Sequence, residues 1–427
     1  MNIKILQGDC IETLQKLDDK SINTCITSPP YWGLRDYGTA EWEGGDSDCD
    51  HVANPNATKK MGNEEFNKNR PSRKSTKTKG YYEKKCPKCG AIKKDSQLGM
   101  EDTPEEFVDN LVKVFREVKR VLRDDGTVWL NLGDSYSSGG RTTTTNQSLR
   151  GDKDYGVTRP KPSKGIKPKD LIGIPWRVAL ALQQDGWYLR QDIIWHKPNP
   201  MPESVKDRCT KAHEYIFLLS KNVKYYFDNE AIKEDAKFPE GPNSAHNIRK
   251  GSDDPKMRTR VGLNKIGANP KRNKRSVWAI TTKPFKGAHF ATFPMDLIEP
   301  CVLAGCPEKI CVDCGKPYKR VMQQPKQLEV KRGRRAGTDD RLIGGVLDKY
   351  KRENPPIDLG LQKQCDCETN ETKAGTVLDP FGGSGTTGIV AVNHNRHAVL
   401  CELNQEYIDL AKDRINQEGG MFVDITE

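Results

Sequence analysis

The sequence contains few apolar residues and no long apolar run. Hydrophobic side chains make up 34% of its 427 residues, and no stretch of eighteen consecutive apolar residues occurs. A helix that spans a membrane needs a stretch of about that length, so the sequence predicts no membrane segment. No apolar segment follows a basic start at the N-terminus either, so no secretory signal is expected. We therefore expect a cytoplasmic protein with no membrane partner.

An excess of acidic residues is also lacking. The chain has 70 Lys and Arg against 59 Asp and Glu, which gives a net charge of +11. A basic surplus favours a polyanionic partner, although it says nothing about the fold. Thirteen cysteines in a cytoplasmic protein indicate thiols or metal ligands more often than disulfides. The length allows one large domain or two ordinary ones.

Predicted strands and helices alternate along most of the chain. The expected strands are 2–6, 22–26, 127–132, 188–195, 214–219, 376–378 and 397–401. The expected helices are 11–17, 103–122, 174–185, 294–303, one that opens within 381–393, and 404–417. Asp125 and Gly126 predict a turn before the strand at 127–132. Such alternation is typical of an α/β fold, and we predict a doubly wound, Rossmann-like sheet.

A glycine-rich turn follows the strand at 376–378. It has the sequence DPFGGSGTTG, and its part from Gly383 to Gly388 matches the pattern G-x-G-x-x-G. Glycines let the backbone approach a ligand closely, and the start of a helix favours an anionic group. Glu402 follows Gly383 by 19 residues, at the end of the next strand, where an acid can bind ribose hydroxyls. Alone, this motif fits NAD, FAD or S-adenosylmethionine.

A second motif, Ser28-Pro29-Pro30-Tyr31, follows the strand at 22–26. Together with the glycine-rich turn far downstream, it resembles the amino-methylating DNA methyltransferases of the β arrangement, in which the catalytic half precedes the cofactor half. Further segments agree in the same order: WHKPNP at 195–200, HEYIF at 213–217 and FPMDLI at 293–298. The resemblance covers the segments 1–42, 101–230, 285–308 and 374–427. It implies S-adenosylmethionine as cofactor, double-stranded DNA as substrate, and a bacterial or phage-encoded enzyme.

The resemblance assigns the chemistry to Ser28, Pro29, Pro30 and Tyr31. An exocyclic amino nitrogen is a poor nucleophile because its lone pair is delocalised into the ring. The Ser28 hydroxyl and the Pro29 carbonyl would accept hydrogen bonds from its N–H groups, while the two prolines stiffen the turn. Tyr31 would stack on a base flipped out of the duplex, since a stacked base cannot reach the site. The methyl group would then pass directly from sulfur to nitrogen.

Six residues are expected, by the same resemblance, to hold the cofactor. They are Asp9, Asp379, Phe381, Gly383, Gly385 and Glu402. Asp9 would approach the adenine and would also cap the helix at 11–17. Asp379 and Phe381 would flank the cofactor, with the ring of Phe381 against its adenine.

Several alternatives stay open. In the resembling family, serine at the first position of this turn is commoner in enzymes that methylate N4 of cytosine, so the resemblance favours that target, and N6 of adenine is the alternative. Ring-carbon methylation needs a nucleophilic cysteine. The one Pro-Cys pair, Pro300-Cys301, lies in an apolar helix pattern, so Cys301 is expected to pack in the core rather than act as a nucleophile. Release-factor glutamine methyltransferases carry a related Asn-Pro-Pro-Tyr turn and the opposite order of halves. Both differences count against that function for this chain. Other classes are a methyltransferase of RNA or protein, and a zinc-dependent nucleic-acid-binding protein without catalysis.

Two groups of cysteines predict structural zinc sites, because C-x-x-C pairs suit tetrahedral zinc. The first group consists of Cys311, Cys314, Cys365 and Cys367. The second consists of Cys49, His51, Cys86 and Cys89. Each group encloses a polar segment that could not build a core of its own, so a metal would supply the folding energy.

These motifs divide the chain into core segments and insertions. The core comprises the first part of the catalytic half (1–42), its remainder (101–235), a helix (285–308) and the cofactor half (374–427). The other segments are a basic insertion with a zinc site (43–100), a target-recognition region (236–284) and an insertion with a zinc site (309–373). Lys and Arg of 59–85, 249–275 and 331–335 are expected to neutralise DNA phosphates. The oligomeric state and the presence of a cognate restriction enzyme stay open.

Overall fold

The computed structural model describes residues 1–33, 41–46, 48–49, 86, 88–94, 97–137, 166–236, 271–282, 293–324, 350, 353–419 and 423–426. The chain divides into two compact units, one made of Met1–Pro29 with Val108–Glu427 and the other of Pro30–Phe107. Among the described residues, no helix is both long and apolar enough to cross a bilayer.

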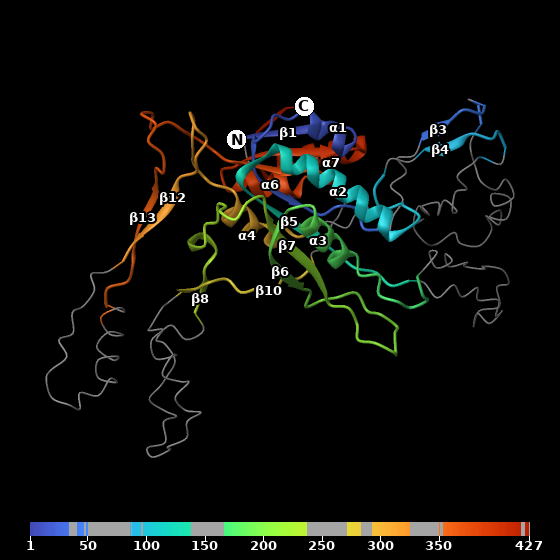
Figure 1. Cartoon of the computed structure of the whole chain (residues 1–427), viewed down its shortest axis with the longest axis horizontal. Helices are drawn as coiled ribbons and strands as arrows, with labels where there is room; N and C mark the ends of the chain where they lie inside the picture. Colours follow the sequence, from blue (N-terminus) through green and yellow to red (C-terminus); the bar gives the residue numbers. More distant parts are fainter. Residues whose placement is uncertain are drawn as a thin grey trace, which may run out of the picture. The chain divides into compact units, whose positions relative to one another are not determined.

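A nine-stranded sheet lies at the centre of the first unit (Figure 1). In spatial order its strands are β10 (Val277–Ala279), β6 (Tyr188–His196), β7 (His213–Ser220), β5 (Leu122–Leu132), β2 (Ile22–Thr27), β15 (Thr376–Asp379), β16 (His397–Glu402), β1 (Asn2–Gln7) and β17 (Asp424–Thr426). All the strands predicted from the sequence are confirmed. The two that were not predicted, β10 and β17, are edge strands of three residues each, too short to show a periodicity.

One strand breaks the predicted parallel arrangement. β7 is antiparallel to both of its neighbours, β6 and β5, whereas every other neighbouring pair of this sheet is parallel. A parallel return would need a crossover, usually a helix. Residues 197–212 contain Pro198, Pro200 and Pro202 and form no helix, so the chain returns as an antiparallel neighbour. The first residues of β7 therefore lie at the same edge as the last residues of β5 and β2.

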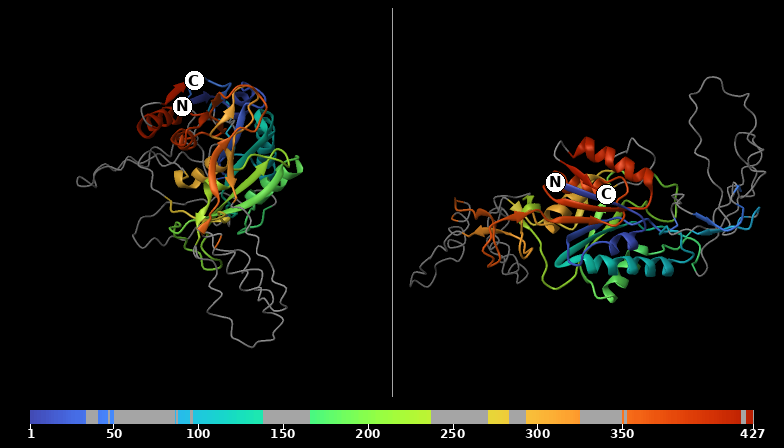
Figure 2. Two further views of the ribbon diagram at one scale, coloured as in Figure 1. Left: turned by 90° about the vertical axis from the view of Figure 1, so that its left-hand side faces the viewer. Right: turned by 90° about the horizontal axis from the view of Figure 1, so that it is seen from above.

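Helices cover both faces of the sheet, as predicted for an α/β fold. On one face, α4 (Met295–Gly305) packs on α6 (Thr386–Asn393), which packs on α7 (Gln405–Glu418). The other face carries α1 (Cys10–Gln15), α2 (Pro104–Val121) and α3 (Ile174–Gln184). The right-hand view of Figure 2 shows α7 on one side of the sheet and α2 with α3 on the other.

The junction of α2 and β5 differs from the sequence prediction. Thr103 caps α2 as expected, since its hydroxyl accepts a hydrogen bond from the Glu106 N–H at 3.2 Å. However, β5 begins at Leu122 without a loop, and the predicted turn at Asp125 and Gly126 is an irregularity inside the strand. A Cβ on Gly126 would lie 2.5 Å from Leu122 Cγ. Glycine thus lets the strand bulge where the sequence suggested a turn.

Four short strand pairs lie outside the central sheet in the part of the chain that the structure describes. They are β3 (Glu41–Glu43) with β4 (Ile92–Lys94), β8 (Glu234–Asp235) with β9 (Lys271–Arg272), β11 (Ile310–Cys311) with β14 (Thr372–Lys373), and β12 (Lys319–Gln323) with β13 (Ile357–Gln362). A 3-10 turn, η1, covers Glu230–Ile232. The basic stretches 59–85 and 331–335, and most of 249–275, lie outside the described residues.

Candidate active site and cysteine clusters

The predicted site residues of the first unit gather where four strands end side by side. β2, β15, β16 and β1 are parallel neighbours, so their carboxyl ends share one edge of the sheet. The chain moves from β2 to β5 in one direction and from β15 to β16 in the other, so its course reverses between β2 and β15. In open α/β sheets, ligands bind at the carboxyl ends of the strands at such a reversal. Ser28 and Asp379 lie on its two sides.

Asp379 ties the two sides together. Its Oδ1 accepts hydrogen bonds from Thr27 Oγ1 at 2.6 Å and from the Phe381 N–H at 3.1 Å, and its Oδ2 accepts one from Thr387 Oγ1 at 2.6 Å. The side chain is buried, and burial raises its pKa to about 6. Asp379 therefore joins the end of β2, the glycine-rich loop and the first turn of α6. Its predicted contact with the cofactor stays a prediction.

Replacing Asp379 with Asn is expected to change how stability depends on pH. Burial raises the pKa of this carboxyl from 3.8 to about 6. The folded state therefore favours the protonated form, and this stabilisation is complete below pH 3.8 and lost as the pH rises through 6. The loss corresponds to about 3 kcal/mol. Free energies of unfolding, measured in urea across this pH range, should show the loss in the wild type and not in the variant. A difference between the two proteins that is constant with pH would contradict it.

Glu402 holds the glycine-rich loop from the neighbouring strand. Its Oε2 accepts a hydrogen bond from the Gly383 N–H at 2.8 Å, and its Oε1 accepts one from the Asn404 N–H at 2.9 Å. Burial raises its pKa. A carboxylate offers about four acceptor positions, so each oxygen keeps capacity for a ribose hydroxyl. At Gly383 an added Cβ would have no neighbour nearer than 3.8 Å, so the space beside this backbone is open to a ligand.

Asp9 has the capping role that the sequence predicted. Its Oδ1 accepts hydrogen bonds from the Ile11 N–H at 2.8 Å and the Glu12 N–H at 3.3 Å, at the start of α1. The preceding Gly8 donates its N–H to the Glu402 carbonyl at 3.0 Å, so the turn after β1 is held beside the end of β16. The predicted approach of Asp9 to the cofactor adenine stays a prediction.

Gly385 and Gly173 offer a matched pair of substitutions. Each is the N-cap of a helix with φ of 77°, in the left-handed region. A Cβ on Gly173 would meet nothing within 4 Å, whereas one on Gly385 would lie 3.0 Å from Ala411 Cβ in α7. We expect Gly173→Ala to cost about 1–2 kcal/mol of stability, the left-handed backbone cost. Gly385→Ala should cost clearly more, because α6 and α7 must also separate. Urea unfolding of both variants measures this, and equal costs would contradict the packing argument.

The Ser-Pro-Pro-Tyr turn begins directly at the end of β2. Ser28 is half-buried and Pro29 is buried, and they are followed by the second compact unit, which starts at Pro30. Within that unit, Trp32 Nε1 donates a hydrogen bond to the Glu101 carbonyl at 2.9 Å, and the Gly33 N–H donates one to the Gly99 carbonyl at 2.8 Å. The segment around Glu101 thus fixes the chain just after Tyr31. Stacking of Tyr31 on a base stays a prediction.

The structure brings the predicted cysteine groups together. The four sulfur atoms of Cys311, Cys314, Cys365 and Cys367 lie within 4.8 Å of one another, and so do those of Cys49, Cys86 and Cys89. The fourth predicted ligand of the second group, His51, lies outside the described residues.

Both Cys-x-x-Cys-Gly segments have the same backbone geometry. The Gly90 N–H donates to the Cys86 carbonyl at 2.9 Å, and the Gly315 N–H donates to the Cys311 carbonyl at 2.9 Å. Both glycines have positive φ, 77° and 67° respectively. The backbone N–H of Cys314 lowers the pKa of Cys311 to about 7, while the Cys314 thiol raises the pKa of Cys367 to about 12. Ionisation of one thiol thus disfavours ionisation of its neighbours, and a bound divalent cation would let all four ionise.

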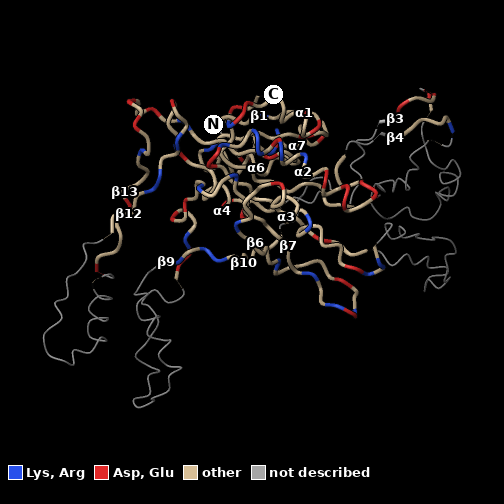
Figure 3. The backbone as a smooth tube through the Cα atoms, in the orientation of Figure 1, with Lys and Arg blue, Asp and Glu red and all other residues tan. Residues whose placement is uncertain are grey.

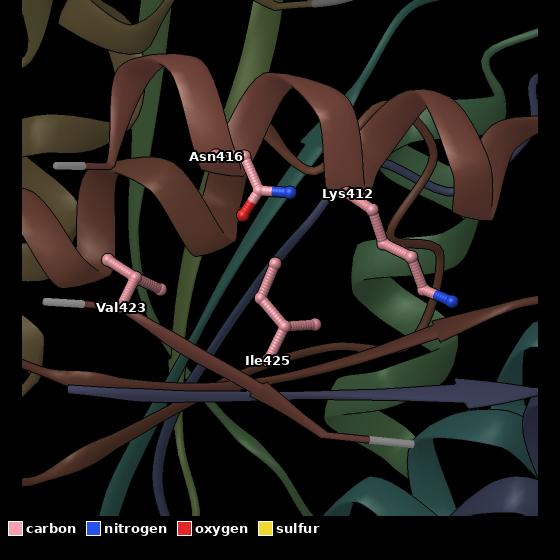
Figure 4. Close-up of a pocket in the computed structure, with 4 residues that line it drawn as sticks. All are labelled: Lys412, Asn416, Val423 and Ile425. Atoms are coloured by element: carbon pink, nitrogen blue, oxygen red, sulfur yellow. The ribbon is translucent and has the colours of Figure 1, made fainter. Parts of the chain in front are cut away.

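A separate pocket of about 470 Å³ lies between α7 and β17 (Figure 4). It is lined by Lys412, Asn416, Val423 and Ile425. β17 pairs with Asn2 to Lys4, the first half of β1, so this pocket is displaced from the carboxyl edge. It is not the site described above.

Several residues of the site were not predicted from the sequence. Thr27 and Thr387 bind Asp379, and Asn131 Nδ2 lies 3.3 Å from Ser28 Oγ. Arg414 Nη1 in α7 donates to the carbonyl and hydroxyl oxygens of Ser384 at 2.7 and 2.8 Å. Thr27 and Thr387 could have been suspected from the sequence, because they lie within the TSPPY and GTTG segments of the two motifs. Asn131 and Arg414 act from other strands and helices, so only the fold identifies them.

Comparison with protein families gives a match over most of the chain. The family model described as DNA methylase, of the N6 and N4 methyltransferases, matches residues 22–314 and 367–413. The type II methyltransferase M.SmaI of Serratia marcescens is 38% identical over 415 residues, which covers 96% of this chain and 90% of the relative. The type II methyltransferase M.Cfr9I of Citrobacter freundii is 34% identical over 415 residues, 97% of this chain and 88% of the relative.

Among solved structures, the PvuII DNA methyltransferase, named as cytosine-N4-specific, is similar with a TM-score of 0.46. The sequence identity is 14%, and the alignment covers 99% of this chain and 89% of that one.

Proposed function

Because the chain belongs to the N6/N4 DNA methylase family, we propose that this DNA methyltransferase uses S-adenosylmethionine to methylate N4 of cytosine in double-stranded DNA. The cytosine assignment is supported by Ser28 at the first position of the Ser-Pro-Pro-Tyr turn. A cytoplasmic location and pairing with a cognate restriction enzyme belong to the same proposal.

The hydrogen bond between Thr27 and Asp379 is the observation that supports this chemistry most directly. It joins the residue before Ser28 to Asp379, the last residue of β15 and the first residue of the glycine-rich segment 379–388, at 2.6 Å. The catalytic turn and the cofactor loop are thus held at one point of the sheet. A direct transfer needs the two reacting atoms in line at a fixed separation, so such a tie serves the reaction.

Ser28 and Pro29 act on the target amino group. The Ser28 hydroxyl and the Pro29 carbonyl each accept a hydrogen bond from one of its two N–H groups. These bonds favour a pyramidal nitrogen with an available lone pair. When bound, S-adenosylmethionine supplies a methyl group on a positively charged sulfur. The nitrogen lone pair would take this methyl group as the carbon–sulfur bond breaks, the electron pair of that bond would stay on sulfur, and the surplus N–H proton would leave to solvent. Tyr31 stacks on the base once it has left the duplex.

The cofactor fits the residues around the glycine-rich loop. Gly383 leaves open space beside its backbone, and the Glu402 carboxylate keeps acceptor capacity for ribose hydroxyls. Asp9, Phe381 and Gly385 complete the proposed site around the adenosine.

Basic residues near β10 suit the DNA backbone. Lys271, Arg272, Lys274 and Arg275 lie in β9 and the segment that leads to β10 (Figure 3). Glu234 lies within ion-pair distance of Arg272, Lys274 and Arg275, and one carboxylate cannot neutralise three cations. We propose that this segment, inside the predicted target-recognition region 236–284, contacts phosphates.

The two cysteine clusters are proposed to bind structural zinc. Four thiolates from Cys311, Cys314, Cys365 and Cys367 would complete a tetrahedral site, and His51 would complete the other with Cys49, Cys86 and Cys89. The shared geometry of the two Cys-x-x-Cys-Gly segments supports the same role for both.

The test of the proposed function is methyl transfer itself. The full chain would be incubated with labelled S-adenosylmethionine and unmethylated duplex DNA, and the DNA would be digested to nucleosides for mass analysis. N4-methylcytosine is the expected product. N6-methyladenine would correct the base, and transfer to RNA or protein instead of DNA would overturn the substrate.

A further inference from the structure

A row of polar side chains crosses four neighbouring strands at the catalytic edge. Asn131 Nδ2, in β5, lies 3.3 Å from Ser28 Oγ and also 3.3 Å from Glu214 Oε2, at the start of β7. The other carboxylate oxygen of Glu214 accepts a hydrogen bond from Lys197, which follows β6. The row thus leads from the catalytic turn to a charged pair on the far side of β5.

The Glu214 carboxylate determines how the Asn131 amide is turned. Only the amide nitrogen can donate, so a rotated amide would place its oxygen against the carboxylate and be repelled. The side chains of Glu214 and Lys197 are only 15% and 19% exposed, so water and salt screen their charges weakly. Lys197 Nζ also lies 4.2 Å from the centre of the Trp195 ring, which holds the ammonium in place.

The antiparallel course of β7 is what makes this arrangement available. Glu214 is the second residue of β7, and in a parallel strand it would lie at the opposite edge of the sheet. Asn131 is the next residue after Leu130, which pairs with Thr27, so it lies beside Ser28. The edge of the sheet at which β2 ends, directly before Ser28, therefore also carries the Glu214 carboxylate, because β7 starts at that edge.

We propose that Asn131 and Glu214 are positioning residues for the methyl transfer, acting through the Ser28 hydroxyl. This inference rests on the proposed function. A hydroxyl oxygen has two lone pairs. The Asn131 amide, held by Glu214, donates to one of them and so directs the other toward the amino group of the target base. Lys197 balances the charge of Glu214 and anchors it.

A double-mutant cycle tests the route through Ser28. The substitution Glu214→Gln keeps the shape of the side chain but removes its charge, and Asn131→Ala removes the donor. Each is expected to lower kcat by about 10-fold to 100-fold, because a misplaced catalytic group costs rates of this order. The Michaelis constant for DNA and the dissociation constant of the cofactor should stay unchanged. In a Ser28→Ala background, Glu214→Gln should lower the residual single-turnover rate no further.

Asp228→Asn is the matched control, since Asp228 forms an ion pair with Arg320 at 3.2 Å and is 8% exposed, away from this row. It should leave kcat unchanged in both backgrounds. An unchanged kcat for both Glu214→Gln and Asn131→Ala would overturn the inference. So would an equal loss from Glu214→Gln with and without Ser28. If Ser28→Ala alone keeps the full rate, the proposed role of Ser28 fails first, and this separates the two failures.

Discussion

Replacing Ser28 with Ala is expected to lower kcat by about 100-fold to 1000-fold, the range found when one polar group that stabilises a transition state is removed. In the proposed mechanism the hydroxyl accepts a hydrogen bond from the target amino group, and without it the nitrogen lone pair would stay delocalised in the ring. Cofactor binding should not change, because Ser28 follows β2 while the glycine-rich loop follows β15. Turnover with duplex DNA and the cofactor dissociation constant, from equilibrium titration, measure the two effects.

Ser21→Ala provides the control for this substitution. Ser21 immediately precedes β2 and Ser28 immediately follows it, so both changes remove a hydroxyl next to the same strand. The Ser21 hydroxyl is exposed and donates to the Asp18 carbonyl at 2.7 Å. Its loss should leave turnover unchanged. A Ser28→Ala variant as active as the Ser21→Ala variant would remove Ser28 from the mechanism.

Loss of metal from the four-cysteine cluster is expected to unfold the insertion 309–373. Structural zinc contributes about 10–16 kcal/mol to the folding of small zinc domains. Apart from the cysteines, the hairpin of β12 and β13 has few buried residues to replace that contribution, since its side chains are exposed or half-buried. Removal of the metal by a strong chelator should therefore abolish the protection of the β12 and β13 amides from hydrogen exchange.

Cys365→Ser compared with Cys209→Ser makes the same test genetically. Cys365 belongs to the cluster, whereas Cys209 is exposed and belongs to neither group. We expect the first variant to lose one bound metal ion per chain, measured by mass spectrometry of the purified protein, and to lose the hairpin protection. The second should match the wild type. A wild-type protein that is folded and active with no bound metal would refute the zinc sites.

The long elements of the fold could be predicted from the sequence because each carries its own signal. The buried stripe of α2, with Leu111, Phe115 and Val118 fully covered, shows the helical spacing directly. The direction of β7 carries no such signal, because an apolar strand has the same pattern in both directions. The bulge at Gly126 resembles a turn in sequence, since a glycine that avoids a backbone clash serves both.

The site was predictable where its residues are adjacent in the chain. The glycine-rich loop and the Ser-Pro-Pro-Tyr turn follow the neighbouring strands β15 and β2, and Glu402 ends β16, the next strand along the sheet. Asn131 and Glu214 were not predicted, because their roles depend on which strands are neighbours. The four-cysteine cluster was predictable because thiols with this spacing have few other uses, whereas the burial of Asp379 depends on packing that no local pattern encodes.

The two ends of the insertion 309–373 meet at one point. The Gly375 N–H donates to the Pro307 carbonyl at 3.1 Å, and a Cβ on Gly375 would lie 2.6 Å from that oxygen. The insertion could therefore be removed by protein engineering, because its removal would leave two chain ends that a short turn can join. Because these ends meet, a change in the length of the segment need not move β15, whose last residue is Asp379.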